Sequence, residues 1–108
     1  MDFAYLIADY PVTQEVLDTA TVRSVSFLDD EVDSGEAFVL RELQMNAVML
    51  VPLIVHDRSW GLVEIYDMRL RRFTTEDEAL ARFLVGQAGR RIEAIGEPSS
   101  PKRRLRFR

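Results

Sequence analysis

The side chains that could do chemistry are few in this chain and widely spaced. His56 is its only histidine, and it stands beside Asp57 and Arg58 between two apolar runs. One histidine lacks the companions that most metal sites need, so the pattern favours a solvated turn over a haem ligand or a general base. Because the only histidine is assigned to a turn, the serines have no histidine base with which to form a hydrolytic triad. No glycine-rich phosphate loop is present. We therefore expect no catalytic residue and no metal ligand.

Three further features have two interpretations each. Glu64 lies inside an apolar run, on the strand face of Leu62 and Tyr66, and is either a polar group in a ligand pocket or a carboxylate that faces solvent or pairs with an arginine. Trp60 and Tyr66 either stack on a ligand or belong to the core, and the core is preferred. The acidic stretch 29–33 lacks the glycine and final glutamate of an EF-hand, so a solvated loop is preferred to a calcium site.

Composition indicates a single soluble domain. The chain has 108 residues, 47% of them hydrophobic and 30% charged, which is enough for one modest core and too short for two domains. The absence of cysteine excludes disulfides, thiolate metal sites and thiol catalysis. No apolar run reaches the roughly 18–20 residues that span a bilayer, and the N-terminus does not resemble a signal peptide. We expect a cytoplasmic protein without membrane contact.

Charge is distributed unevenly along the chain. Residues 102–108 hold 5 of the 14 basic residues and no acidic one, which leaves 9 basic against 18 acidic residues in the rest. An acidic body does not suit the phosphate backbone of a nucleic acid, whereas the basic segment could contact nucleic acid or anionic lipid. A solubilising tail or a linker is the preferred interpretation. We therefore predict a domain over residues 1–96 and a flexible tail over residues 97–108.

The first half of the chain predicts short elements. Phe3, Tyr5 and Ile7 alternate in a strand over residues 2–8, and Pro11 opens a helix over residues 11–19. The residues 21–28 are rich in β-branched and aromatic side chains, which indicates a strand near a sheet edge. Ser34 is suited to cap a helix over residues 35–45.

The second half has stronger signals. The apolar run 47–55 contains Pro52, which argues against a helix and for a strand with a bulge or a partly free edge. A loop over residues 56–59 leads to a second strand over residues 60–68, in which Gly61 marks a bulge or a close backbone approach. Thr74 and three following carboxylates begin a helix that runs over residues 75–95 and ends at Gly96.

The order and spacing of four segments resemble the GAF domain, a small-molecule sensing and dimerisation module. These segments are residues 9–17, 43–53, 60–66 and 72–80, and the motif is Val-Pro-Leu, a turn, Gly-Leu-Val, and then Phe-Thr-Thr-Glu. The resemblance implies an α+β fold, an antiparallel sheet with helices packed on it in the layered profilin-like or PAS-like manner. Bilin-binding and reductase members need cysteines that are absent here, the Asn-Lys-x-Asp-Glu motif of cyclic-nucleotide members is missing, and His56 is poorly placed for haem. No cofactor is therefore expected.

One departure from the family matters. A complete GAF domain has an N-terminal helix and a further strand before the point where the resemblance begins, and that strand lies in the middle of the sheet. The unpaired backbone N–H and C=O groups of a strand edge without its partner cost free energy when buried, or pair with another chain when exposed. Residues 2–8 could move into the vacancy, a second copy could donate an element, or the chain could be part of a longer protein, and these alternatives stay open.

We expect a non-catalytic regulatory module that binds a small molecule, dimerises, or does both, and that passes a signal through its C-terminal helix. The candidate ligand pocket is lined by Phe27, Asp30, Phe38, Met49, Val51, Glu64 and Tyr66. The candidate homodimer interface is the helical stripe of Leu80, Leu84, Ala88 and Ile92, which Ile95 continues. The alternatives are a dimerisation scaffold without a ligand, and nucleic-acid contact through the basic tail.

Overall fold

The computed structural model describes residues 11–96 in full and residues 103–107 as backbone. The elements follow one another as α1 (Pro11–Thr19), β1 (Arg23–Ser26), α2 (Ser34–Leu43), β2 (Ala47–Val55), β3 (Arg58–Asp67), α3 (Thr75–Ile95) and β4 (Arg103–Phe107). The helices predicted over residues 11–19 and 75–95 and the strand over 47–55 are confirmed. The strand predicted over residues 2–8 lies outside the described residues.

The strands form one sheet in the order β1-β2-β3-β4. Strands β1, β2 and β3 pair antiparallel, which confirms the α+β class, and β4 adds a parallel pairing along the outer edge of β3. Strand β4 corrects the prediction that residues 97–108 lack regular structure. Two arginines alternate with Leu105 and Phe107 there, but five residues are too few to make a period of two distinctive. The unpaired edge of β3 supplies the partner that the local pattern cannot reveal.

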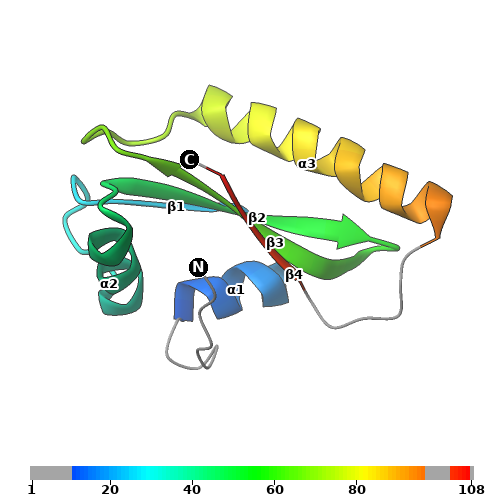
Figure 1. Ribbon diagram of the computed structural model, residues 1–108, viewed down its shortest axis with the longest axis horizontal. Helices are drawn as coiled ribbons and strands as arrows, with labels where there is room; N and C mark the ends of the chain where they lie inside the picture. Colours follow the sequence, from blue (N-terminus) through cyan, green and yellow to red (C-terminus); the bar gives the residue numbers. More distant parts are fainter. Residues whose placement is uncertain (1–10, 97–102, 108) are drawn as a thin grey trace.

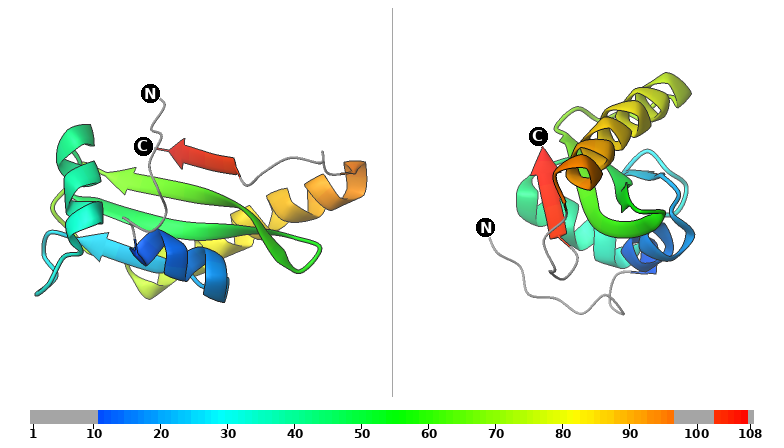
Figure 2. Two further views of the ribbon diagram at one scale, coloured as in Figure 1. Left: turned by 90° about the horizontal axis from the view of Figure 1, so that it is seen from below. Right: turned by 90° about the vertical axis from the view of Figure 1, so that its right-hand side faces the viewer.

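The sheet separates two layers of helices (Figure 1). Helices α1 and α2 lie on one face, and α3 crosses the other face; Figure 2 shows the same arrangement from two further directions. Because successive strand side chains point to opposite faces, the apolar runs of β2 and β3 supply two cores. Val48, Leu50 and Leu62 pack toward α1 and α2, whereas Met49, Val51 and Val63 pack toward α3.

The hairpin of β2 and β3 is longer than the sequence predicts. Its turn consists of His56 and Asp57 alone, with φ of 50° and 62°, the left-handed conformation that two-residue hairpin turns require. The predicted loop over residues 56–59 is therefore too long by two residues. The register shifts between Leu53 and Ile54, opposite the residues that flank Trp60, so the bulge predicted near Gly61 is confirmed.

The partly free edge predicted at Pro52 is confirmed as well. Strand β1 pairs only with Ala47 to Leu50 of β2 and ends before Pro52 is reached. A residue without an N–H is tolerated there because no neighbouring strand needs one. Strand β1 is also shorter than the predicted 21–28, because Asp29 folds back to accept a hydrogen bond from the backbone N–H of Ser26.

Side-chain caps decide where the helices begin. Asp33, not the predicted Ser34, caps α2, and its carboxylate accepts from the N–H of Glu36. The helix then ends at Leu43, two residues earlier than predicted, because Gln44 takes a left-handed conformation. The cap predicted at Thr74 is confirmed, and Asp77 completes a capping box by accepting from the Thr74 N–H.

Candidate functional site

The seven predicted pocket residues do not line one cavity. The register of the hairpin pairs Val48 with Tyr66 and Leu50 with Glu64, so these residues share the face covered by α1 and α2. Met49 and Val51, between them in sequence, belong to the core under α3 instead. This corrects the single-pocket prediction, which took residues from both faces of a strand whose side chains alternate.

The other predicted pocket residues lie near the turn after β1 and on α2. Phe27 is half-buried against the core of α1 and α2, and the guanidinium of Arg41 lies 5.5 Å from its ring centroid. Asp30 and Phe38 are exposed to solvent. Asp29 is held by Arg72, whose Nε lies 3.2 Å from its carboxylate, so one acidic side chain of this loop is already engaged.

The sheet face under α1 and α2 holds buried polar groups that local sequence signals did not reveal. Glu64 and Glu36 are each 2% exposed, and Thr13 on α1 is fully buried. The Thr13 hydroxyl donates to Glu36 Oε2 at 3.4 Å and so joins α1 to α2. Around them Val16 and Leu40 are fully buried, so apolar side chains fill most of the space between these helices and the sheet. Burial of these carboxylates depends on tertiary contacts: the sequence left two alternatives open for Glu64 and gave no signal for Glu36.

A hollow remains at the end of this face nearest α2. Met45, Tyr66, Asp67, Met68 and Arg69 line it, and its volume is about 480 Å³. It combines two flexible thioether side chains and an aromatic ring with an ion pair at its rim, a mixture of apolar and polar groups that suits a small molecule. Tyr66 is the only one of the seven predicted pocket residues that contributes to this lining.

The rim of the hollow is joined electrostatically to the start of α3. Arg69 Nη2 lies 2.8 Å from Asp67 Oδ2, and Arg71 Nη1 approaches the same oxygen at 3.5 Å. The other end of the Arg71 guanidinium pairs with Asp77, the residue that closes the capping box of α3. Arg71 therefore contacts both the hollow and the helix.

Both carboxylates in this chain of contacts are stabilised in their charged form. The hydrogen bond from the Arg69 side chain is the largest cause that holds the pKa of Asp67 below its ordinary value. For Asp77 the main cause is the hydrogen bond from the backbone N–H of Thr74, and the nearby Arg71 lowers the pKa of that carboxyl further. The two groups stay ionised at neutral pH and can hold Arg71 between them.

The predicted interface stripe on α3 divides between two environments. Ala81, Val85 and Gly89 face the sheet and are buried. Leu80 and Leu84 are 60% and 56% exposed, and Ala88 is exposed beside them. Ile92 packs partly against the core under α3, so it belongs to the inward face and not to the predicted outward stripe. The reason is the helical period, which places residue 92 close to the direction of residues 81 and 85.

Large apolar side chains extend this exposed surface beyond the predicted stripe. Phe83 is 59% exposed, and Ile95, the last residue of α3, is 77% exposed. We call Leu80, Phe83, Leu84, Ala88 and Ile95 the outer face of α3. Only the contact between α3 and the sheet reveals that Phe83 points away from the core.

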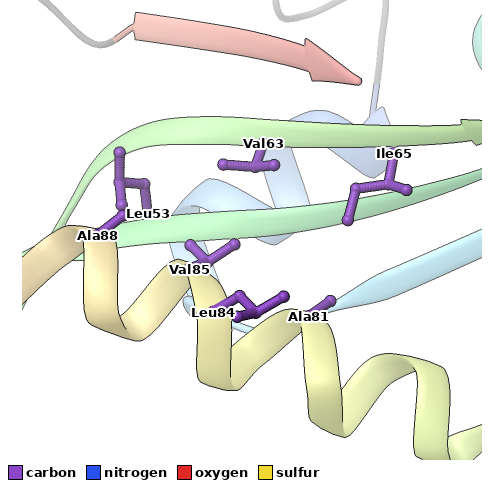
Figure 3. A pocket seen from close by; sticks show the side chains of 7 residues that line it. All are labelled: Leu53, Val63, Ile65, Ala81, Leu84, Val85 and Ala88. Atoms are coloured by element: carbon purple, nitrogen blue, oxygen red, sulfur yellow. The ribbon is translucent and has the colours of Figure 1, made fainter. Parts of the chain in front are cut away.

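A groove runs between α3 and the sheet next to the outer face (Figure 3). Its volume is about 320 Å³. Leu84 and Ala88 form one wall, and side chains of β2 and β3 form the floor; the full lining is Leu53, Val63, Ile65, Ala81, Leu84, Val85 and Ala88. Every lining residue is apolar, so the groove excludes a charged ligand and favours an apolar partner surface.

The remaining candidate residues have structural roles. His56 lies in the exposed hairpin turn, where its backbone N–H donates to Glu93 of α3 at 2.7 Å. Ser59 donates to the carbonyl of Leu17, and Ser26 donates to the carbonyl of Arg71, so both hydroxyls join elements. No cluster of metal-ligating side chains occurs among the described residues. Within the same part of the chain, no helix is both long enough and apolar enough to span a bilayer.

The chain matches a known protein family. A family model described as GAF domain matches residues 4–92, which is most of the chain. No curated protein matches the chain. The matched span includes the hollow, the hairpin and all but the end of α3.

Proposed function

This chain belongs to the GAF domain family, whose members are generally regulatory or sensory modules that bind small molecules, and we propose that it is a non-catalytic regulatory module that self-associates through α3. In this proposal the partner on α3 is a second copy of the chain. A small molecule in the hollow beside Tyr66 modulates the association. The signal leaves the domain as a shift at the contact between the two α3 helices.

The observation that carries this proposal is the outer face of α3. Three large side chains on it, Leu80, Phe83 and Leu84, are each more than half exposed, and an entirely apolar groove adjoins them. Contiguous exposed apolar surface of this kind marks an interaction site on a soluble protein. Burying these side chains against a second copy would remove their apolar area from water, which stabilises the dimer by about 25 cal/mol for each Å² buried.

Arg71 supports the link between ligand and helix. It contacts Asp67 at the rim of the hollow and Asp77 in the cap of α3. A ligand that engages Asp67 or Arg69 would change how Arg71 is shared between the two carboxylates. Because Asp77 accepts from the backbone N–H of Thr74, the N-cap residue of α3, such a change reaches α3 without any movement of the sheet.

Two alternatives are distinguished by experiment. A scaffold that dimerises without a ligand would use the same outer face of α3 and leave the hollow empty. Nucleic-acid contact through residues 102–108 would give strongly salt-dependent retention of DNA that disappears when those residues are deleted.

Sedimentation velocity tests the self-association. Leu84→Glu should convert a dimer to a monomer, because it places a carboxylate in an apolar contact. Leu70→Glu is the matched control, since Leu70 is 58% exposed but lies in the loop before α3. A chain that is monomeric before substitution, or a dimer that survives Leu84→Glu, contradicts the proposal.

Native mass spectrometry tests the ligand. The purified chain should carry a small molecule that Met68→Trp displaces, because Met68 lines the hollow and is exposed enough to accept the larger ring. Leu70→Trp, a neighbouring substitution outside the lining, should retain the molecule. A dimer without any bound molecule supports the scaffold alternative, and a molecule retained by Met68→Trp shows that it binds elsewhere.

A further inference from the structure

The two ends of α3 carry opposite charges, and we propose that two copies of the chain pack their α3 helices antiparallel, centred on Leu84. This inference rests on the proposed self-association and specifies its geometry. The acidic first turn contains Glu76, Asp77 and Glu78, whereas Arg90 and Arg91 lie near the other end. A helix with this polarity is complementary to a reversed copy of itself.

The charges near the ends are available for a partner. Glu76, Arg90 and Arg91 are exposed, and they form no ion pair with any residue of the described chain. Glu93, the one acidic residue beside the arginines, is engaged by the backbone N–H of His56 in the hairpin turn. The C-terminal end of α3 therefore presents positive charge to solvent, and the N-terminal end presents negative charge.

The spacing of the outer face fits a two-fold axis at Leu84. Asp77 precedes Leu84 by seven residues and Arg91 follows it by seven, so a reversed copy brings the acidic turn of one helix to Arg91 of the other. In the same register Leu80 meets Ala88 of the second copy. A large side chain then faces a small one on both sides of the axis, which lets the two helices approach closely.

A parallel pair would lack both advantages. It would place Arg91 beside Arg91 and Glu76 beside Glu76, and like charges in direct contact oppose association. It would also set Leu80 against Leu80 and leave Ala88 against Ala88, which gives an uneven contact along the helix. The macrodipoles of the two helices, although screened at the surface, also favour the antiparallel arrangement.

Disulfide trapping tests the orientation directly, because the natural chain has no cysteine. Three single variants are prepared, Leu80→Cys, Leu84→Cys and Ala88→Cys. In an antiparallel dimer the two Ala88 positions are displaced along the axis by about 12 Å, from about 1.5 Å per residue over eight residues. That displacement is too large for a disulfide, which needs Cβ atoms about 4 Å apart.

The expected pattern is specific. Under mild oxidation, Leu84→Cys is the one variant that forms a covalent dimer by itself. An equimolar mixture of Leu80→Cys and Ala88→Cys forms a covalent heterodimer. Leu80→Cys and Ala88→Cys should each remain largely uncrosslinked when oxidised alone. Efficient self-crosslinking of both single variants would show a parallel pair and overturn this inference while leaving the proposed self-association intact. A monomer in sedimentation of the natural chain refutes both.

Charge reversal provides an independent measurement. Arg91→Glu and Glu76→Arg should each weaken self-association roughly tenfold, because two symmetry-related exposed contacts change from attraction to repulsion. The double variant should recover most of the loss, since the reversed charges meet again across the axis. Glu76 is used in place of Asp77 because Asp77 belongs to the helix cap. Additive weakening in the double variant contradicts the antiparallel arrangement.

Discussion

Gly89→Ala should destabilise the domain, although the same substitution at Gly86, one turn earlier in α3, should stabilise it. At Gly89 the helix crosses β2 so closely that an added Cβ would overlap the carbonyl oxygen of Ile54. The same Cβ would lie 3.4 Å from the carbonyl carbon of Ile54 and 3.8 Å from Leu53 Cδ1. A backbone carbonyl in a paired strand cannot rotate away, so the helix must move.

The size of the effect follows from this displacement. Relief of the overlap requires α3 to move by roughly 1 Å, which forfeits about a quarter to a half of the dispersion energy of its nearest contacts, those of Val85 and Ala81. Overpacking with a backbone shift costs about 1–3 kcal/mol. Alanine returns up to about 1 kcal/mol through its higher helix propensity. We expect a net loss of up to about 2 kcal/mol in the free energy of unfolding.

Urea and thermal unfolding, followed by circular dichroism, measure both variants. At Gly86 the nearest atom to an added Cβ is Arg90 Nη1 at 3.8 Å, an ordinary contact, so only the propensity gain of about 1 kcal/mol remains. The midpoint should fall by roughly 4–8 °C per kcal/mol for Gly89→Ala and rise by a similar increment for Gly86→Ala. Equal stabilisation of both variants would refute the close crossing of α3 over β2. Because α3 also carries the proposed dimer contact, both variants are measured in the Leu84→Glu background.

Three further outcomes are expected. Thr74→Ala, which removes the hydroxyl that accepts from the Asp77 N–H, should lower the unfolding free energy by about 1 kcal/mol in urea titrations, and Thr75→Ala should not. Asp77→Asn should be less stable than the natural chain at neutral pH and equally stable in acid. A carboxyl with a depressed pKa stabilises the fold above its unfolded pKa of about 4, and this stabilisation is lost as pH falls through the folded pKa. A stability difference that persists at pH 2 would contradict this. Deletion of residues 103–108 should uncover the edge of β3 and increase both amide exchange along β3 and aggregation, measured by hydrogen exchange and light scattering.

Local sequence signals predicted the hairpin and α3 because several independent signals agree there. These signals each act over a few residues: the apolar run of β2, Pro52 within it at a position that β1 does not reach, and the capping box at Thr74. The GAF resemblance depends on the same elements and is confirmed by the family match. Weaker, shorter elements were placed less well: β1 is half its predicted length, and α2 begins at a different cap.

Assignment of side chains to faces required the tertiary structure. Glu64 and Tyr66 could be placed on one strand face from their alternation, but the register between β2 and β3 decides that Met49 and Val51 lie on the other. The hollow likewise draws on residues before β2 and after β3, which approach one another only because the hairpin closes. Arg71 could not be recognised as a link between Asp67 and Asp77 without the path of the loop that carries it.

The sequence alone determined which segments are extended and which are helical, because alternation, capping and proline act between near neighbours along the chain. It also determined the polarity of charge along α3 and the absence of thiol chemistry. Only the tertiary structure decided which side of α3 meets the sheet, and hence that Phe83 is exposed while Ile92 is partly covered. The direction in which an amphipathic helix faces depends on the surface that receives it, and for α3 that surface is built from strands far away in the sequence.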